Sequence, residues 1–527
     1  GDAHGHARCR SAQDDPGSPN GRREAVRDTF PRSERIANLA PPDVIGQGSR
    51  RAGARPRAKP TPADSTKPSA TLGASSASLE ARTNRRFREP PRRQRRQTAT
   101  TRVRKLNIEL AYGRDGMTVS LPDDRTTVIE PLFIPGLPDE VGAIRTALRD
   151  PVGVDPLRRM AAPADTVAIS VCDITRPMPS KLVLPAVLRE LGHVDTEQIT
   201  ILIATGTHRA NTRNELREML GAEVVDSYRV VNHDAFDPDT LELTGETPNG
   251  IPIWLNRLWV NADVRITTGF VEPHFFAGFS GGPKMVAPGM AGFDTTMRLH
   301  NAEMIAHPNS VWGITEGNPV HDAIRQISRQ TGVHFAVDVT INRDHRITSV
   351  YTGDPEAVHR TACRFARSTA MQPVDEPFDV VVTTNSGYPQ DLNLYQAVKG
   401  MSAAAQVVKQ GGTIICAAEC SDGVPEHGLY AELLRSGSSP VDLLRTIRSP
   451  GHNRHDQWQV QLQAQIQLKA DVQLKSDYLS DEQVRAAHLT PIHNVEAAVA
   501  AALKRHGAES KVCVLPQGPQ TIPYLRL

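Results

Sequence analysis

Cysteine is scarce in this sequence, and long apolar runs are absent. The 527 residues include 6 cysteines, none of which is part of a Cys-x-x-Cys motif. Cysteines this few and scattered argue against a disulfide framework and against a thiolate cage for a metal. No run of about 20 apolar residues occurs, as a membrane-spanning helix would need, and no apolar core of a secretory signal is found. We therefore expect a cytoplasmic protein with no membrane partner.

The first hundred residues lack any sustained apolar pattern. They contain 21 Lys and Arg residues against 10 Asp and Glu, in a background rich in Pro, Ser, Ala and Gly. Such a segment buries too little apolar surface to offset the entropy lost on ordering, so residues 1–103 are predicted to form a disordered basic tail. Because the sequence starts with Gly1, it leaves open whether this tail belongs to the native protein.

The basic tail raises the question of a nucleic-acid partner. The stretch 82–97, RTNRRFREPPRRQRRQ, could bind nucleic acid or another anionic surface. No aromatic platform or folded module accompanies it, and residues 101–527 hold 40 basic against 49 acidic side chains. A mildly acidic body offers no electrostatic attraction for nucleic acid. We therefore expect no nucleic-acid partner.

From about residue 104 onward, short β-branched runs alternate with helical stretches. Strands are predicted at 166–173, 198–208 and 262–270, with helices at about 179–191 and 213–220. Strands separated by helices of this length indicate βαβ units in a mainly parallel, doubly wound sheet. Residues 104–372 are therefore predicted to form an N-terminal α/β domain.

A second α/β block begins near residue 373. Strands are predicted at 378–387 and 411–420, with a helix at 393–408 between them. We predict a C-terminal α/β domain over 373–508, with an active site in the cleft between the two domains. A last strand in 509–527 could return to either domain, including the N-terminal one.

Three polar side chains follow strands of the first block at or near their carboxyl ends. They are Asp173, His208 and His274. Ligands in open α/β sheets bind beyond these strand ends, so the three loops are expected to converge on one site. Two of the three, Asp173 and His208, also have an interpretation without a functional role. Asp173 could simply form an ion pair with Arg176 in the motif CDITRP, and His208 could be an exposed turn residue rather than a general base.

The loop after the third strand is rich in glycine. Its segment GFSGGPK, which contains Gly281, Gly282 and Lys284, resembles a phosphate cradle in which backbone N–H groups and a lysine meet an anion. It lacks the GxxxxGK[ST] spacing of a Walker A motif, which argues against nucleoside triphosphate hydrolysis. His274 lies before Lys284 and His300 after it, so two imidazoles are available as bases or metal ligands near one lysine.

A polar helix face is predicted in the second block. The segment GYPQDLNLYQAVKGM places Tyr395, Gln396 and Lys399 on one helix, with Gln396 and Lys399 three residues apart on the same face. This face is either a solvated surface or, if it borders the interdomain cleft, a grip for the polar end of a small substrate.

Taken together and in this order, the motifs DxTRP, TGTH, PHFFAGFSGGPK, LHN and GYPxDxNLYQAVKGM closely resemble the nickel-dependent lactate racemase family. The resemblance spans about 105–527 and excludes the tail. It implies that the N-terminal domain binds a nickel-pincer nucleotide, which is the Ni(II) complex of pyridinium-3,5-bisthiocarboxylic acid mononucleotide. It further implies that Lys284 carries this cofactor, that His300 completes the nickel shell, and that Gly281 and Gly282 contact the nucleotide. A single imidazole beside the sulfur and carbon donors of the cofactor suits nickel.

The resemblance also implies a reaction and a set of roles. A 2-hydroxy acid of the lactate type would be racemised by hydride transfer to the cofactor and back, while His208 and His274 act as the two general bases. Arg176 and Lys399 would hold the carboxylate and oxygen of the substrate, with help from Gln396. Asp173 would orient Arg176. Tyr395 and Trp458 complete the expected substrate contacts, and enzymes of cofactor biosynthesis are expected partners.

The rival hypothesis for the glycine-rich loop is a protein without catalysis. Such a protein would use the loop to bind a nucleotide or a phosphate ligand, and no hydride chemistry would follow. The sequence does not identify which 2-hydroxy acid is the substrate.

Overall fold

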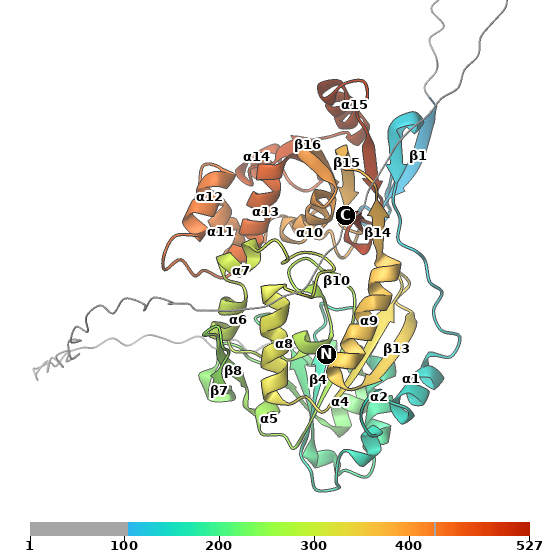
Figure 1. Cartoon of the computed structure of the whole chain (residues 1–527), viewed down its shortest axis with the longest axis vertical. Coiled ribbons are helices and arrows are strands. Elements are labelled where there is room, and N and C mark those ends of the chain that lie inside the picture. Colours follow the sequence, from blue (N-terminus) through green and yellow to red (C-terminus); the bar gives the residue numbers. More distant parts are fainter. Residues whose placement is uncertain (1–103, 426–427, 527) are drawn as a thin grey trace, which may run out of the picture. The chain divides into compact units, whose positions relative to one another are not determined.

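The computed structural model describes residues 104–425 and 428–526, which belong to one compact unit, Gln97–Leu527. The predicted basic tail at 1–103 lies outside the described residues. Within the described part, the two largest sheets have six strands each, and Figure 1 shows the elements around them. Every helix in the described ranges is too short or too polar to span a lipid bilayer.

The first sheet is mainly parallel. Its strand order is β13-β12-β9-β4-β5-β6, and only β13 runs antiparallel to its neighbour. In that order the strands are Ile347–Gly353, Phe335–Ile341, Val264–Phe270, Val167–Cys172, Ile199–Ala204 and Arg229–Asn232. The associated helices are α1 Glu140–Arg149, α2 Ser180–Glu190, α3 Arg213–Leu220, α4 Ala222–Ser227, α5 Arg257–Val260, α6 Phe293–Leu299, α7 Ala302–Ala306, α8 Pro319–Thr331 and α9 Pro355–Ala370.

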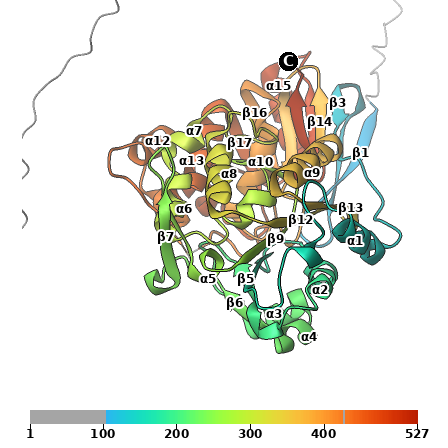
Figure 2. The ribbon, with the colours of Figure 1, turned by 60° about the horizontal axis from the view of Figure 1, so that its bottom comes forward.

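Helices cover both faces of this sheet, which explains why its central strands are apolar throughout. Along β4, Val167, Ile169 and Val171 pack in a cluster with α1 and α2, whereas Ala168 faces a cluster that includes α8. Figure 2 shows α1 and α2 on one side of the sheet and α8 on the other. Strands buried on both faces are typical of parallel sheets in α/β proteins.

The second sheet is parallel throughout. Its strand order is β18-β17-β16-β15-β19-β3. In that order the strands are Thr490–Ile492, Ala470–Lys475, Val408–Ala417, Phe378–Thr384, Val512–Leu515 and Thr126–Val128. The helices of this part are α10 Leu394–Ala405, α11 Tyr430–Arg435, α12 Pro440–Ile447, α13 Gln457–Lys469, α14 Asp481–Ala486 and α15 Val495–His506.

Four two-stranded pairings complete the described structure. They are β1 Lys105–Leu110 with β2 Met117–Pro122, β7 Leu241–Glu246 with β8 Pro252–Asn256, β10 Pro273–His274 with β11 Gly278–Phe279, and β14 Met371–Val374 with β20 Ile522–Leu525.

The two α/β blocks with mainly parallel sheets confirm the predicted fold class. The chain crosses between the blocks in a way that the sequence does not indicate. Strand β3 pairs with β19, so residues 126–128 lie in the second sheet although they precede every strand of the first. The last predicted strand also lies in the second sheet, because β19 pairs with β15 on its other side. The β1–β2 hairpin packs on this sheet and on α15.

Candidate active site

Asp173 and His208 form a hydrogen-bonded pair at the carboxyl ends of β4 and β5. His208 Nδ1–H donates to Asp173 Oδ2 over 2.8 Å, and the hydroxyl of Thr175 donates to Asp173 Oδ1 over 2.9 Å. The side chain of Asp173 is 4% exposed, whereas that of His208 is 48% exposed. Burial alone would raise the pKa of Asp173, but the hydrogen bond from His208 and the nearby positive charge of Arg176 outweigh it and lower this pKa.

The local sequence explains how His208 reaches its partner. β4 and β5 are neighbours in the sheet, so the loops that follow them lie together. The turn after β5 passes through Gly206, whose φ of +56° favours glycine, and the N–H of Gly206 donates to the carbonyl of Gly289 over 2.9 Å. His208 then folds back to donate its own N–H to the carbonyl of Thr205. The turn thereby presents the imidazole at the strand ends.

His274 lies in the short hairpin of β10 and β11 that follows β9. Its Nδ1 accepts hydrogen bonds from the backbone N–H groups of Phe276 and Ala277, each over 3.2 Å. In the neutral ring the proton is therefore assigned to Nε2. Burial, together with the charges of Lys284 and Arg176, lowers the pKa of His274 well below 6.5. The ring also stacks on Phe275, with 4.6 Å between centroids.

Lys284 lies beside His274. Its Nζ is 3.4 Å from Nε2 of His274. Burial, followed by the charges of Arg176 and Lys399, lowers the pKa of Lys284 from 10.5 to about 7. A neutral amine is therefore well populated near pH 7, and in that form Lys284 accepts the Nε2–H of His274. A lysine that loses its proton near neutral pH can act as a nucleophile.

The glycines of this loop have a packing role. An added Cβ would lie 2.7 Å from Val271 at Gly281, 2.4 Å from His359 at Gly282 and 2.2 Å from the carbonyl oxygen of Ile314 at Gly278. All three glycines also have positive φ angles. The fold of the loop against the rest of the protein thus accounts for these glycines by itself, and a contact of Gly281 or Gly282 with a cofactor stays a prediction.

Replacing Gly282 by alanine is expected to destabilise the protein by about 2–5 kcal/mol. A positive φ costs a non-glycine residue about 1–2 kcal/mol, and the clash with His359 adds a cost of overpacking of about 1–3 kcal/mol. Gly411→Ala is the matched control, because Gly411 has a φ of +76° and no atom within 4 Å of its added Cβ. Urea unfolding of both variants measures the difference. Equal losses of stability would contradict the packing role.

His300 lies at the C-terminal end of α6, where one of its two ring nitrogens bonds the helix. Its Nδ1–H donates to the carbonyl of Thr296 over 2.8 Å, which leaves the lone pair of Nε2 available. Burial lowers the pKa of His300 to about 4, against the raising effect of this hydrogen bond. The ring lies 4.8 Å from the ring of Trp458. A neutral imidazole fixed through Nδ1 is the usual state of a histidine that ligates a metal.

Helices α10 and α13 supply the residues predicted in the second block. Lys399 on α10 has its Nζ 5.9 Å from the ring centre of Phe275, and burial together with the charge of Arg176 lowers its pKa to about 8. Gln396 lies one turn earlier on the same helix. On α13, Trp458 is 7% exposed, and its Nε1–H donates to the hydroxyl of Tyr395 over 3.1 Å.

These residues form one electrostatic group. The charges of Arg176 and Lys399 both lower the pKa of Lys284, and the same two charges lower the pKa of His274.

The predicted partner of Asp173 is Arg176, but its observed partners are different. Among the described residues Asp173 bonds His208 and Thr175, and it forms no ion pair with Arg176, whose side chain is exposed. Asp173 thus contacts His208, because the sharp turn after β5 brings the imidazole to the buried carboxylate, and its role in orienting Arg176 stays a prediction.

His455 also joins this group, although the sequence analysis did not identify it. It precedes α13, its Nε2 lies 3.3 Å from the hydroxyl of Thr207, and its ring meets that of Trp458 edge-on at 5.0 Å. It thus links the loop that carries His208 to α13. The segment HDQWQ, which begins with His455, carries no chemical signature of this contact. Only the fold brings the two segments together.

The lowered pKa of Lys284 predicts a pH-dependent stability. Between about pH 7 and 10.5 the unfolded chain binds a proton at Lys284 that the folded protein does not, so the free energy of unfolding should rise with pH in this range. Lys284→Met should reduce this rise, whereas Lys504→Met on the exposed face of α15 should leave it unchanged. Urea unfolding at a series of pH values measures the slope. The same slope in wild type and Lys284→Met would contradict the assignment.

A metal held by the protein alone is not indicated in the described ranges. No group of three or more His, Cys, Asp or Glu side chains suited to a metal ion occurs there.

Two family models match the chain. The lactate racemase N-terminal domain matches residues 112–313, and the lactate racemase C-terminal domain matches residues 374–522. The lactate racemase of Thermoanaerobacterium thermosaccharolyticum is 34% identical over 429 residues, which cover 79% of this chain and 99% of that protein. The lactate racemase of Lactiplantibacillus plantarum is 33% identical over 416 residues, covering 78% and 98%.

Solved structures agree with these matches. The lactate racemase apoprotein of T. thermosaccharolyticum superposes with a TM-score of 0.75 at 34% identity, over 80% of this chain and all of that one. A protein from Thermotoga maritima shares the fold, with a TM-score of 0.58 at 20% identity, over 75% of this chain and all of that one. The chain therefore belongs to the lactate racemase family, and it is an enzyme of the isomerase class.

Proposed function

We propose that this enzyme racemises a 2-hydroxy acid, with lactate as the first candidate substrate. The observation that carries the proposal is the contact of Lys284 with His274 beside the cationic side chains of Arg176 and Lys399. Such a group combines a reactive amine, a proton carrier and two positive charges for an anionic substrate. The relatives that are named lactate racemase support lactate as the substrate to test first.

Arg176 and Lys399 are proposed to bind the substrate. The guanidinium of Arg176 can hold a carboxylate through two parallel hydrogen bonds, and its exposed side chain is free to meet an incoming anion. Lys399 would hold the hydroxyl oxygen, with Gln396 one turn away as a second donor. Tyr395 and Trp458 would form the wall of the pocket, since their mutual hydrogen bond fixes both rings.

His208 is proposed as a general base for the hydroxyl proton of the substrate. Its Nδ1–H is held by the ionised carboxylate of Asp173, so the lone pair of Nε2 is free to accept a proton. The carboxylate also stabilises the imidazolium that then forms. A base that is oriented in this way typically contributes about 10²–10⁴-fold to a rate.

His274 is proposed as the second base, and its geometry differs from that of His208. Because Nδ1 accepts two backbone N–H groups, Nε2 carries the proton in the neutral ring. In this state Nε2–H can donate a hydrogen bond to a substrate oxygen. Nε2 can accept a proton only after it has lost its own. This requires the proton to move to Nδ1, so the ring must turn or give up the hydrogen bonds from Phe276 and Ala277.

The proposed cofactor is the nickel-pincer nucleotide. Lys284 would anchor it covalently, because an amine with a pKa near 7 is a competent nucleophile, and His300 Nε2 would ligate the nickel ion. The backbone near Gly281 and Gly282 would meet its nucleotide part. When bound, this group would supply an acceptor for the hydride that leaves the α-carbon of the substrate. Enzymes of cofactor biosynthesis would be the partners, and the cytoplasmic location stays a prediction.

The test follows the two enantiomers of each substrate over time. Protein produced together with the cofactor-biosynthesis enzymes is incubated with pure L-lactate and, separately, with other 2-hydroxy acids, and chiral chromatography measures the enantiomeric excess. We expect the excess to fall to zero for at least one acid. Unchanged enantiomeric excess for every acid, with retained nucleotide binding, would favour the rival of a non-catalytic phosphate-ligand protein.

A further inference from the structure

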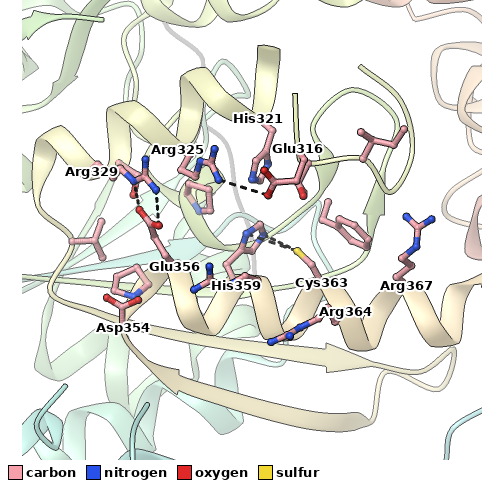
Figure 3. Close-up of a pocket in the computed structure, with 18 of the residues that line it drawn as sticks. Glu316, His321, Arg325, Arg329, Asp354, Glu356, His359, Cys363, Arg364 and Arg367 are labelled. Carbon is pink, nitrogen blue, oxygen red and sulfur yellow. Dashed lines mark hydrogen bonds and ion pairs between the residues drawn. The ribbon is translucent and has the colours of Figure 1, made fainter. Parts of the chain in front are cut away.

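A cavity of about 650 Å³ lies between α8 and α9, apart from the catalytic group. Figure 3 shows the two helices with side chains from both around the cavity. The glycine-rich loop contributes Phe279 and Pro283 to its wall, but neither Lys284 nor any of the proposed bases lines it. Its volume lies within the range of about 300–1,000 Å³ that is typical of small-molecule sites.

The lining of this cavity is rich in arginine. Five arginines contribute to it, against three carboxylates. The arginines are Arg325 and Arg329 on α8 and Arg360, Arg364 and Arg367 on α9. The carboxylates belong to Glu316, Asp354 and Glu356. The cavity therefore carries a net positive charge.

The arginines of α8 have carboxylate partners. Arg329 pairs with Glu356, and Arg325 donates to Asp322 over 2.8 Å. Figure 3 shows the pair of Arg329 and Glu356 across the two helices. These contacts offset the charge on one side of the cavity.

The arginines of α9 lack such partners. Arg360, Arg364 and Arg367 are spaced by four and three residues, so they follow one face of the helix. Among the described residues, none of the three forms an ion pair with a carboxylate. Arg367 donates to the carbonyl of Gly313 and lies over the ring of Tyr524, while Arg360 and Arg364 stay exposed. Like charges at this spacing repel each other, and a bound anion would remove that repulsion.

Two histidines in the lining of the cavity are held in place by hydrogen bonds and carry no charge near pH 7. His321 donates to the carbonyl of Ala277 over 3.1 Å, and His359 donates to the carbonyl of Ser280 over 2.9 Å. Burial lowers the pKa of both, to about 3 for His321. Because these lowered pKa values keep both imidazoles neutral near pH 7, the charge of the cavity is set by its arginines and carboxylates. A preformed wall of this kind reduces the cost of ordering a site on binding.

We propose that the cavity between α8 and α9 binds a small anion that carries phosphate or carboxylate groups. The planar guanidinium groups of Arg360 and Arg364 would bind such groups through paired hydrogen bonds. The first hundred residues of the chain are not a suitable occupant, because their own charge is strongly positive. The proposal does not depend on racemase activity.

Isothermal titration of the full-length protein, purified without cofactor, tests the proposal with inorganic phosphate and with citrate in separate experiments. We expect saturable binding of at least one probe at about 50 mM ionic strength, and weaker binding as salt is added. The double variant Arg360→Ala/Arg364→Ala should bind at least about tenfold more weakly, because it removes both guanidinium groups that are proposed to hold the anion. Preference for phosphate or for citrate identifies which acid group the site takes.

Two controls separate this site from other anion binding. Arg213→Ala/Arg217→Ala removes an exposed pair of arginines with the same spacing on α3 and should bind as wild type. Arg176→Ala/Lys399→Ala removes the cations of the candidate active site and should also retain this binding. The proposal is overturned if neither probe binds saturably, if Arg360→Ala/Arg364→Ala binds as wild type, or if binding is lost in Arg176→Ala/Lys399→Ala. Circular dichroism confirms that each variant is folded.

Discussion

Replacing Lys284 by alanine is expected to lower the rate of racemisation about a thousandfold or more. The substitution removes the amine proposed to anchor the cofactor, and a reactant that is no longer tethered loses the entropic advantage of being held in place. It also removes the partner of His274 Nε2. Initial rates from either enantiomer, measured by chiral chromatography on protein made with the cofactor-biosynthesis enzymes, give the ratio.

Lys284→Arg separates the amine from the charge at this position. Arginine retains a positive charge but cannot supply a neutral amine near pH 7. We therefore expect Lys284→Arg to be as inactive as Lys284→Ala, while Lys504→Ala on the exposed face of α15 keeps the wild-type rate. Activity of Lys284→Arg near that of wild type would show that charge alone is needed. Such a result would remove the anchoring role from the account.

Asp173→Asn is expected to lower kcat by about 10–100-fold while KM changes by less than about threefold. The carboxylate accepts Nδ1–H of His208, so its loss removes the group that fixes the tautomer of this base and stabilises the imidazolium. No ion pair joins Asp173 to Arg176 in the described residues, so substrate binding through Arg176 should persist. Steady-state kinetics over a range of substrate concentrations separates the two parameters.

Thr175→Val is the matched comparison for this substitution. It removes the hydroxyl that donates to Asp173 and leaves the contact with His208 in place, so kcat should fall far less than in Asp173→Asn. A rise of KM with little change of kcat in Asp173→Asn would show that Asp173 orients Arg176 after all. That outcome would contradict the assignment of Asp173 as the residue that orients His208.

The framework of the site could be predicted because its signals are local. The strand preceding Asp173 is an apolar run, predicted at 166–173 and observed as Val167–Cys172. The helix predicted at 213–220 is observed as Arg213–Leu220, where Thr212 and Glu215 form a capping box that is visible in the sequence. Placing polar side chains at the ends of parallel strands then needs only the general rule for such sheets.

The contacts within the site could not be predicted, because they join segments far apart in the chain. Asp173 and His208 meet only because β4 and β5 are neighbours in the sheet, and the turn at Gly206 decides which partner Asp173 takes. His455 reaches Thr207 over 248 positions in sequence. The pairing of β3 with β19 likewise follows from tertiary packing. The sequence of the glycine-rich loop indicates a phosphate cradle, but it does not indicate that the fold itself occupies the space beside these glycines.

The most direct test of the central claim is the mass of the peptide that carries Lys284. Protein made with the cofactor-biosynthesis enzymes is digested and analysed by mass spectrometry, and nickel is measured in the same sample. The account predicts a covalent adduct on Lys284 and about one nickel ion per chain in racemase-active protein, with the adduct absent from Lys284→Ala. Fully active protein in which Lys284 is unmodified would contradict the account.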